Sequence, residues 1–210
     1  LAPNAQQWLS ADRRATRSVR TVGVIIGPDV ANAYLERSTL ETVYQDVSVA
    51  AGAGATAATV RSMFAGLDIV HVAAHGTFRA DHPLLSTLRL HDGESTLYDT
   101  VPERVVSRLI VLSSCQGGAH GNEEGSEVLG LAAVMLARGA AAVLAPLTIV
   151  RDLECAEFVV DVHQRLAAGD AIGPAVADVR QRWLADDDLS RWAVASSFTC
   201  FGSDAVRVVT

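Results

Sequence analysis

Short apolar runs alternate along this chain with longer stretches in which apolar and polar positions recur at helical spacing. Residues 22–26 and 109–112 are rich in Val, Ile and Leu without polar alternation, which predicts strands that are covered on both faces. Between such runs, as at residues 31–44, apolar positions are spaced among charges as on a helix. The alternation of strands and helices predicts an α/β fold with a mostly parallel central sheet flanked by helices.

The pattern assigns most of the chain to regular elements. The expected strands are residues 22–26, 47–50, 67–74, 109–112, 141–145 and 192–201. The expected helices are residues 31–44, 57–65, 126–136, 153–166 and 175–184. Residues 78–97 break the rhythm, because 88–91 alternate and are followed by Asp92-Gly93, which predicts a small antiparallel insert around a turn.

Length, composition and charge narrow the class of protein. The chain has 210 residues, of which 50% are hydrophobic and 20% charged, so one domain with a substantial core is expected. The formal net charge is -7 and there is no basic run, which argues against direct binding of nucleic acid. No apolar run approaches the length of a membrane helix, so no membrane contact is expected.

The cysteines and the first residues indicate where the protein works and how it is organised. Cys115, Cys155 and Cys200 are odd in number, widely spaced and without a C-x-x-C pair, which favours a reducing, cytoplasmic compartment. The chain begins with Leu1 rather than Met, and the sequence leaves open whether it is a piece of a longer protein. Residues 1–19 are expected to be a leading helix or linker, and residues 20–210 the domain itself.

Cys115 follows the run at 109–112 and precedes Gln116-Gly-Gly, so it is expected just beyond the carboxyl end of a buried strand. In open α/β sheets this is the edge at which ligands bind. The alternative is structural, because free cysteine is often a small buried hydrophobe. The position of Cys115 is nevertheless suited to a nucleophile that faces a cleft.

Two histidines lie on the strand predicted at residues 67–74 or at its end. His71 and His75 are four residues apart, which on a strand separates them by about 13 Å, so they cannot share one metal ion. His71 lies in mid-strand and is expected to be a core histidine. His75 precedes Gly76 at the carboxyl end, where it would meet Cys115 if the two strands are parallel neighbours.

Together these residues supply the groups that thiol acyl transfer needs. A nearby imidazole can take the proton of a cysteine thiol and later protonate the leaving amine. The backbone amides of Gly76 and Cys115 are candidate donors to the tetrahedral oxyanion. The chemistry requires neither a metal ion nor an organic cofactor, and none is expected.

These motifs resemble those of the CHAT domain, in the caspase-like cysteine peptidases of clan CD, a group that includes separases and metacaspases. The resemblance rests on His75-Gly76, the insert, and the strand that runs into Cys115, and it extends over residues 125–139, 145–152 and 192–202. It implies a three-layer caspase-like fold, with His75 as general base, Cys115 as nucleophile, and Gly76 with the Cys115 amide as oxyanion hole. It also implies a protein or peptide substrate, and regulation by a partner protein or by fused sensor or repeat modules.

The same resemblance suggests residues that bind the substrate side chain. Ser113 occupies a place where some relatives carry an acid for a basic side chain. Asp152 ends a segment similar to one in separases, whose aspartate recognises arginine, so Asp152 is expected to favour Arg or Lys before the scissile bond. The structural alternative for Asp152 is a helix N-cap. The tryptophan of the family near the pocket is replaced here around Thr148, which implies a different pocket shape.

Two other classes of function remain open from the sequence. A catalytically inactive CHAT-like module would serve as a partner-binding scaffold, with Cys115 kept as a core residue. A nucleotide-binding doubly wound domain would need a phosphate loop. Residues 52–56 lack the Lys of such a loop and the third glycine of a dinucleotide fingerprint, so this reading is disfavoured.

Overall fold

The computed structural model of the chain describes residues 20–77, 79, 81–113, 126–148 and 150–208. A six-stranded sheet in the order β2-β1-β3-β7-β8-β9 forms the centre, and a three-stranded sheet β4-β5-β6 lies beside it. The strands of the central sheet are β1 (Val22–Ile26), β2 (Val47–Ala50), β3 (Ile69–Ala73), β7 (Leu109–Leu112), β8 (Ala142–Pro146) and β9 (Phe198–Gly202). The smaller sheet consists of β4 (Gly76–Thr77), β5 (Thr87–Leu90) and β6 (Gly93–Thr96).

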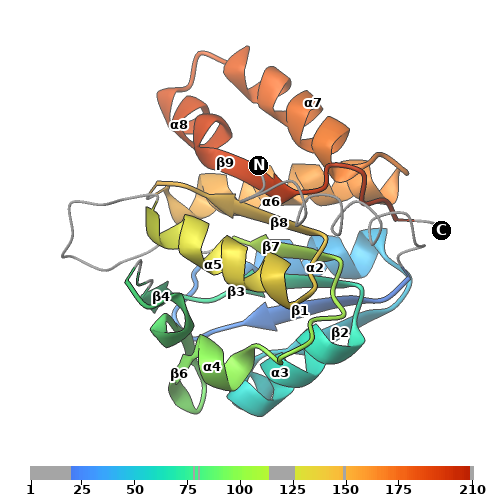
Figure 1. Cartoon of the computed structure of the whole chain (residues 1–210). Helices are drawn as coiled ribbons and strands as arrows, with labels where there is room; N and C mark the ends of the chain where they lie inside the picture. The colour runs from blue at the N-terminus through green and yellow to red at the C-terminus, as the bar shows by residue number, and fades with distance from the viewer. Residues whose placement is uncertain (1–19, 78, 80, 114–125, 149, 209–210) are drawn as a thin grey trace.

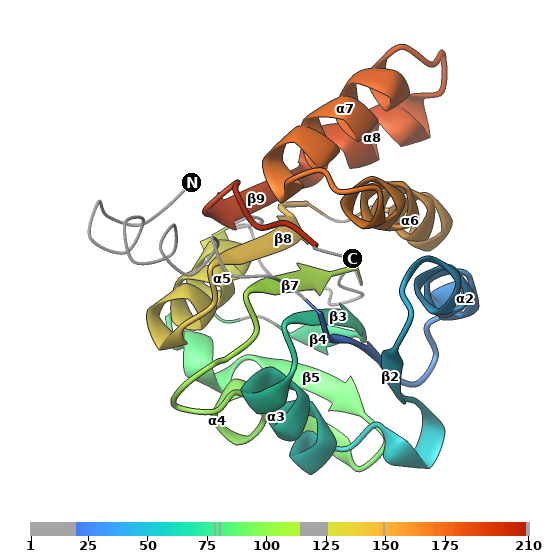
Figure 2. The same cartoon turned by 90° about the vertical axis from the view of Figure 1, so that its right-hand side faces the viewer.

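Helices cover both faces of the central sheet, as Figures 1 and 2 show. α2 and α6 lie on one face, and α3 and α5 lie on the other. α7 and α8 pack against α6 and against each other near β9. The α-helices are α2 (Ala33–Val43), α3 (Ala57–Gly66), α4 (Leu97–Thr100), α5 (Ser126–Arg138), α6 (Asp152–Ala167), α7 (Ile172–Leu184) and α8 (Leu189–Ser197). Two 3-10 turns, Gly52–Gly54 and Pro83–Leu85, complete the described elements.

The sheet is mostly parallel, as predicted. All neighbours in it pair in parallel except β9, which runs antiparallel to β8. On β3, Ile69 packs with the core that faces α2 and α6, whereas Val70 and Val72 pack with the core that faces α3 and α5. A strand buried on both faces needs no polar alternation, which explains the continuous apolar runs of the sequence.

The antiparallel insert predicted within residues 78–97 is confirmed. β5 pairs with β6 in antiparallel register across a turn at His91 and Asp92. Gly93, the first residue of β6, has a φ of 113°, which lies in a region that favours glycine. The predicted cap of α3 is also found, because the Thr56 hydroxyl accepts from the amide of Thr59 at 3.3 Å. The carboxylate of Asp92, in the turn, accepts from the amide of Ala57 at 3.1 Å. The insert is therefore tied to the first turn of α3.

One predicted element is wrong. Residues 192–201 were expected to form a single strand, but residues up to Ser197 belong to helix α8, and only β9 is extended. Asp188 starts this helix, because its carboxylate accepts from the amide of Ser190 at 2.8 Å. Val194 is buried, whereas Trp192, two residues before it, is 44% exposed. The apolar residues of this run therefore lie on one side of a helix and do not cover both faces of a strand.

Within the described part of the chain, no helix has both the length and the apolar character required to cross a membrane.

Candidate active site

The carboxyl ends of β3 and β7 lie side by side, which meets the condition under which His75 was expected to approach Cys115. The two strands pair in parallel, and Val72 lies opposite Leu112 near their ends. The amide of Ser113 donates to the carbonyl of Val72 at 3.0 Å, so the hydrogen bonding between the two strands continues one residue beyond Leu112. His75 follows β3 at this edge. Cys115 follows β7 in sequence and lies outside the described residues.

His75 is half-buried, and the loop that follows β1 orients its ring. Nε2 of His75 lies 3.1 Å from the backbone carbonyl oxygen of Asp29. Because a carbonyl oxygen can only accept, Nε2 carries the hydrogen, and Nδ1 keeps its lone pair in the neutral ring. The arrangement leaves Nδ1 as the nitrogen that can take a proton from another group.

Asp29 is itself held on both sides. Its φ is 63°, a left-handed conformation that Asp tolerates better than most residues. Its carboxylate pairs with the guanidinium of Arg89 at 3.1 Å, and the amide of Arg89 donates to the carbonyl of His75 at 2.7 Å. His75, Asp29 and Arg89 therefore form a closed ring of contacts between the loop after β1, the segment after β3, and β5.

Gly76 begins β4, the edge strand of the smaller sheet. A side chain at this position would collide with the backbone carbonyl oxygen of Thr87 on β5, so the pairing itself requires glycine. Antiparallel ladders alternate, and the bond from the Arg89 amide to His75 makes these two a hydrogen-bonded pair. Gly76, one residue on, therefore points its amide away from β5, toward the open side of β4.

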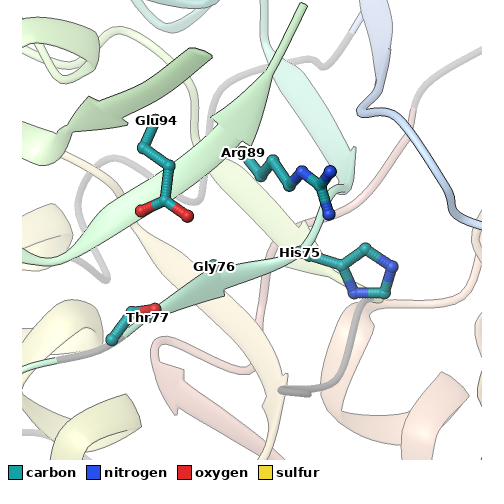
Figure 3. Close-up of a pocket in the computed structure, with 5 residues that line it drawn as sticks. All are labelled: His75, Gly76, Thr77, Arg89 and Glu94. Atoms are coloured by element: carbon teal, nitrogen blue, oxygen red, sulfur yellow. The ribbon is translucent and has the colours of Figure 1, made fainter. Parts of the chain in front are cut away.

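A hollow of about 270 Å³ opens beside His75 and is lined by His75, Gly76, Thr77, Arg89 and Glu94 (Figure 3). The guanidinium of Arg89 extends toward the His75 ring, whereas the Glu94 carboxylate lies nearer Gly76 and Thr77. Arg89, Glu94 and Asp29 are not among the site residues predicted from the sequence. Their only local signals are the alternation along the insert and the Gly-Pro-Asp turn at the end of a strand.

Ser113, a candidate substrate-binding residue, is buried with 3% of its surface exposed. Its hydroxyl donates to the carbonyl of Val72 at 3.3 Å. Its own carbonyl accepts from the thiol of Cys155, a fully buried residue of α6. Ser113 thus joins β3, β7 and α6 just before the position of Cys115.

Asp152, the other candidate, is the first residue of α6 rather than its N-cap, which is Arg151. Its Oδ2 accepts from the backbone amide of Asn32 at 3.0 Å and from the side-chain amide of Asn32 at 2.6 Å. Asn32 is the N-cap of α2, so Asp152 links the starts of α2 and α6. The loop between β1 and α2 thereby contacts two candidate residues, His75 through Asp29 and Asp152 through Asn32.

The segment that resembles the family's pocket tryptophan also has a structural partner. Both the amide and the hydroxyl of Thr148 donate to the Ser197 hydroxyl, each at 3.0 Å. Thr148 therefore connects the end of β8 to the end of α8.

The two cysteines that the structure describes are unsuited to nucleophilic chemistry. Cys155 is fully buried. Burial raises the pKa of the Cys200 thiol to about 12, so the reactive thiolate is scarce at neutral pH. Among the described residues, no three His, Cys, Asp or Glu side chains gather in a way that could hold a metal ion.

Solved structures with the same fold come from a bacterial protease. The complex of the pro- and mature domains of RgpB from Porphyromonas gingivalis matches 97% of this chain at 12% identity, with a TM-score of 0.66. The Arg-specific cysteine proteinase gingipain R (RgpB) matches 98% of the chain at 11% identity, with a TM-score of 0.63. This chain spans 53% and 52% of those two structures, about half of each.

No protein of curated function matches the chain in sequence. The family model of the CHAT domain matches residues 5–203, nearly the whole chain. The match to the family model thus confirms the resemblance to the CHAT domain that was seen in the sequence. The similarity to the two solved structures confirms the three-layer fold. This chain belongs to the CHAT domain family and has the caspase-like α/β fold.

Proposed function

We propose that this domain is a cysteine endopeptidase in which His75 and Cys115 form the catalytic dyad. The observation that carries the proposal is the register of β3 and β7. Val72 lies opposite Leu112, and His75 and Cys115 each follow three residues after that pair. Adjacent strands lie about 5 Å apart, so we expect side chains that follow them at equal distances along the chain to lie within reach of one substrate.

The proposed reaction starts with proton transfer from the Cys115 thiol to Nδ1 of His75. The thiolate attacks the carbonyl carbon of the scissile peptide bond, and the tetrahedral oxyanion accepts from the amides of Gly76 and Cys115. The C–N bond then breaks, and the imidazolium gives its proton to the leaving amine, which leaves a thioester. Water attacks this thioester with His75 as base, and the product acid and the free thiol are released.

Two features of the described residues support these roles. The Asp29 carbonyl accepts from Nε2 of His75 at 3.1 Å, so it stabilises the imidazolium and holds the tautomer that the first step needs. The amide of Gly76 points away from β5, as an oxyanion donor must. Each feature serves the proposed chemistry without a metal ion or an organic cofactor.

Substrate preference and regulation form the finer part of the proposal. We assign Asp152 to the pocket for a basic residue before the scissile bond, whereas Ser113, which is buried and donates its hydroxyl to the carbonyl of Val72, supports the strand end instead of contacting the substrate. Gingipain R, which has the same fold, is an Arg-specific proteinase, and this supports the assignment. The RgpB complex pairs a mature domain with its prodomain, which supports control of this domain by a partner or by other modules. We also propose a cytoplasmic location, which is supported by the cysteine pattern alone. The division into a leading segment of residues 1–19 and a domain of residues 20–210 is supported by the sequence alone.

The reactivity of Cys115 tests the dyad without knowledge of the substrate. The 210-residue chain is treated with iodoacetamide at pH 7, and labelling is followed by mass spectrometry at each cysteine. Cys115 is expected to react much faster than Cys155 or Cys200, which serve as internal controls. His75→Ala should slow the labelling of Cys115 by about tenfold, because the thiol loses its base.

Cleavage of a peptide library completes the test. Cys115→Ala and His75→Ala should each lower the cleavage rate by about a thousandfold or more. If Cys115 resists alkylation in the wild type and no peptide is cut, the inactive scaffold becomes the better reading of the fold. Asp152→Asn should weaken the preference for Arg or Lys, and an unchanged preference would remove Asp152 from the pocket.

A further inference from the structure

The smaller sheet presents two charged side chains beside His75 that the proposed chemistry does not use. The amide of Arg89 donates to the carbonyl of His75 at 2.7 Å, and Arg89 lies opposite Glu94 in the pairing of β5 with β6. Residues directly opposite each other on adjacent strands lie on the same face of a sheet. His75, Arg89 and Glu94 therefore form one row across the smaller sheet, and this row lines the hollow (Figure 3).

The two ends of the hollow differ in charge. At the end beside His75, Arg89 is 52% exposed, and its contact with Asp29 engages only part of a guanidinium that has five N–H donors. At the other end, the Glu94 carboxylate accepts from the hydroxyl of Thr87 at 2.9 Å and remains exposed. A ligand that enters from the His75 side meets the cation first.

The proposed reaction determines which part of a peptide lies at this end. His75 returns its proton to the leaving amine, and that nitrogen belongs to the residue that follows the scissile bond. Proton transfer requires this nitrogen to lie within hydrogen-bond distance of the ring. The side chain of the same residue then has the hollow, with Arg89 at its near end, directly within reach.

We propose that the hollow is the subsite for the residue after the scissile bond, and that Arg89 makes it prefer Asp or Glu. The inference rests on the peptidase function proposed above. Glu94, at the far end of the row, opposes an acidic side chain. At this peptide position, Arg89 is thus expected to strengthen the binding of an acidic side chain and Glu94 to weaken it.

The test separates binding from cleavage. A peptide library randomised over six positions is passed over the immobilised Cys115→Ala chain, which retains the hollow but lacks the nucleophile, and bound peptides are identified by mass spectrometry. Peptides with Asp or Glu should be enriched over their Asn or Gln counterparts by about fivefold, the size expected for an exposed charge pair. The enrichment should shrink as salt rises, because the pair is solvent-accessible.

Three second-site variants of that chain identify the residue responsible. Arg89→Gln should abolish the acidic enrichment, and Glu94→Gln should increase it. Asp29→Asn is the matched control for Arg89→Gln, because both changes break the ion pair of Arg89 with Asp29, but only Arg89→Gln removes the positive charge. The acidic enrichment should therefore survive in Asp29→Asn. If the enrichment is lost equally in Asp29→Asn and Arg89→Gln, the two residues act only by positioning the loop after β1. That result would overturn the subsite.

Wild-type cleavage distinguishes this inference from the proposed function. In cut peptides, the acidic preference should fall at the position after the cleaved bond. Acidic enrichment on the Cys115→Ala chain without any cleavage by the wild type would show that the hollow recognises acidic side chains, and would contradict the peptidase and, with it, the assignment to the position after the scissile bond. Cleavage without a charge preference at that position, or no acidic enrichment on any chain, would overturn the subsite.

Discussion

The backbone carbonyl of Asp29 lies 3.1 Å from Nε2 of His75, although the two residues are 46 positions apart in the chain. The φ of Asp29 is 63°. Asn adopts this left-handed conformation readily, whereas a β-branched residue does not. We therefore expect Asp29→Val to lower the free energy of unfolding by about 1–2 kcal/mol and to reduce kcat, because the carbonyl that orients His75 shifts.

Asp29→Asn is the control for this prediction, because it keeps the left-handed conformation and loses only the charge. It should change the free energy of unfolding by less than about 0.5 kcal/mol, since the lost ion pair with Arg89 is exposed. Urea unfolding and steady-state cleavage measure both quantities. Equal effects of Asn and Val would show that the charge of Asp29, and not its backbone conformation, orients His75.

Stability should fall as the pH drops below about 6.5, the usual pKa of histidine. His163 is fully buried, with Nδ1 2.9 Å from the Tyr44 hydroxyl and Nε2 3.1 Å from Nδ1 of His71. Nε2 of His71 faces Oε2 of Glu36 at 3.5 Å. Burial, reinforced by the nearby His71, holds the pKa of His163 well below its usual range.

Because the folded state keeps His163 neutral while the unfolded state takes up a proton, acid favours unfolding. The loss should approach about 1.4 kcal/mol per pH unit for this one proton, until the pH reaches the folded pKa. Urea midpoints at pH 7.5, 6.5 and 5.5 measure it. The double variant Tyr44→Phe, His163→Leu should have a smaller pH slope, and a wild-type midpoint that does not fall with acid would contradict the prediction.

Asp68 should stabilise the amino-terminal edge of the sheet. Its carboxylate accepts from the amide of Arg20 at 2.9 Å, from the amide and hydroxyl of Thr21, and from Arg108 at 2.6 Å. Burial pushes the pKa of Asp68 upward, but the hydrogen bonds from Arg20, Arg108 and Thr21 outweigh it and hold the pKa below its usual range. This stabilisation is present above the unfolded pKa of about 3.9 and is lost as the pH falls through the folded pKa.

Asp68→Asn is therefore expected to cost about 2 kcal/mol of unfolding free energy at pH 7, since Arg108 is nearly buried and loses its carboxylate partner. Glu41→Gln, which breaks the exposed pair of Arg37 and Glu41 on α2, is the control and should cost less than about 0.5 kcal/mol. Chemical denaturation of both variants compares them. A similar small loss in each would mean that the Asp68 pair is no better than a surface pair.

Gly76→Ala should displace β4 from β5, because the added methyl group meets the carbonyl of Thr87. We expect a loss of about 1–3 kcal/mol and a larger proportional loss of cleavage, because the amide proposed for the oxyanion moves with β4. Thr77→Ala, one residue on at an exposed position, is the control. Thermal unfolding and kcat report the two effects, and normal cleavage by Gly76→Ala would remove this amide from the proposed oxyanion hole.

The sequence pattern predicted most strands and helices and a mostly parallel sheet, because these follow from local periodicity and the rules of parallel sheets. The direct pairing of β3 with β7, which was assumed from the sequence only as a condition, comes from the structure. The pattern failed at α8, where an apolar run fits either a strand or one face of a helix, and the capping by Asp188 decides. It also could not predict that Asp29 orients His75 or that Asp152 binds Asn32. These contacts join residues 46 and 120 positions apart, and local patterns carry no information about them.

The pairing of β3 directly with β7 has a consequence for how such a domain can diversify. The stretch from β5 to α4 lies outside the central sheet, so its length and charges can change without altering the pairing of β3 with β7. Arg89 and Glu94 both belong to this stretch. If the proposed subsite is correct, the preference for the residue after the scissile bond is encoded in a stretch that can be exchanged while the central sheet is left intact.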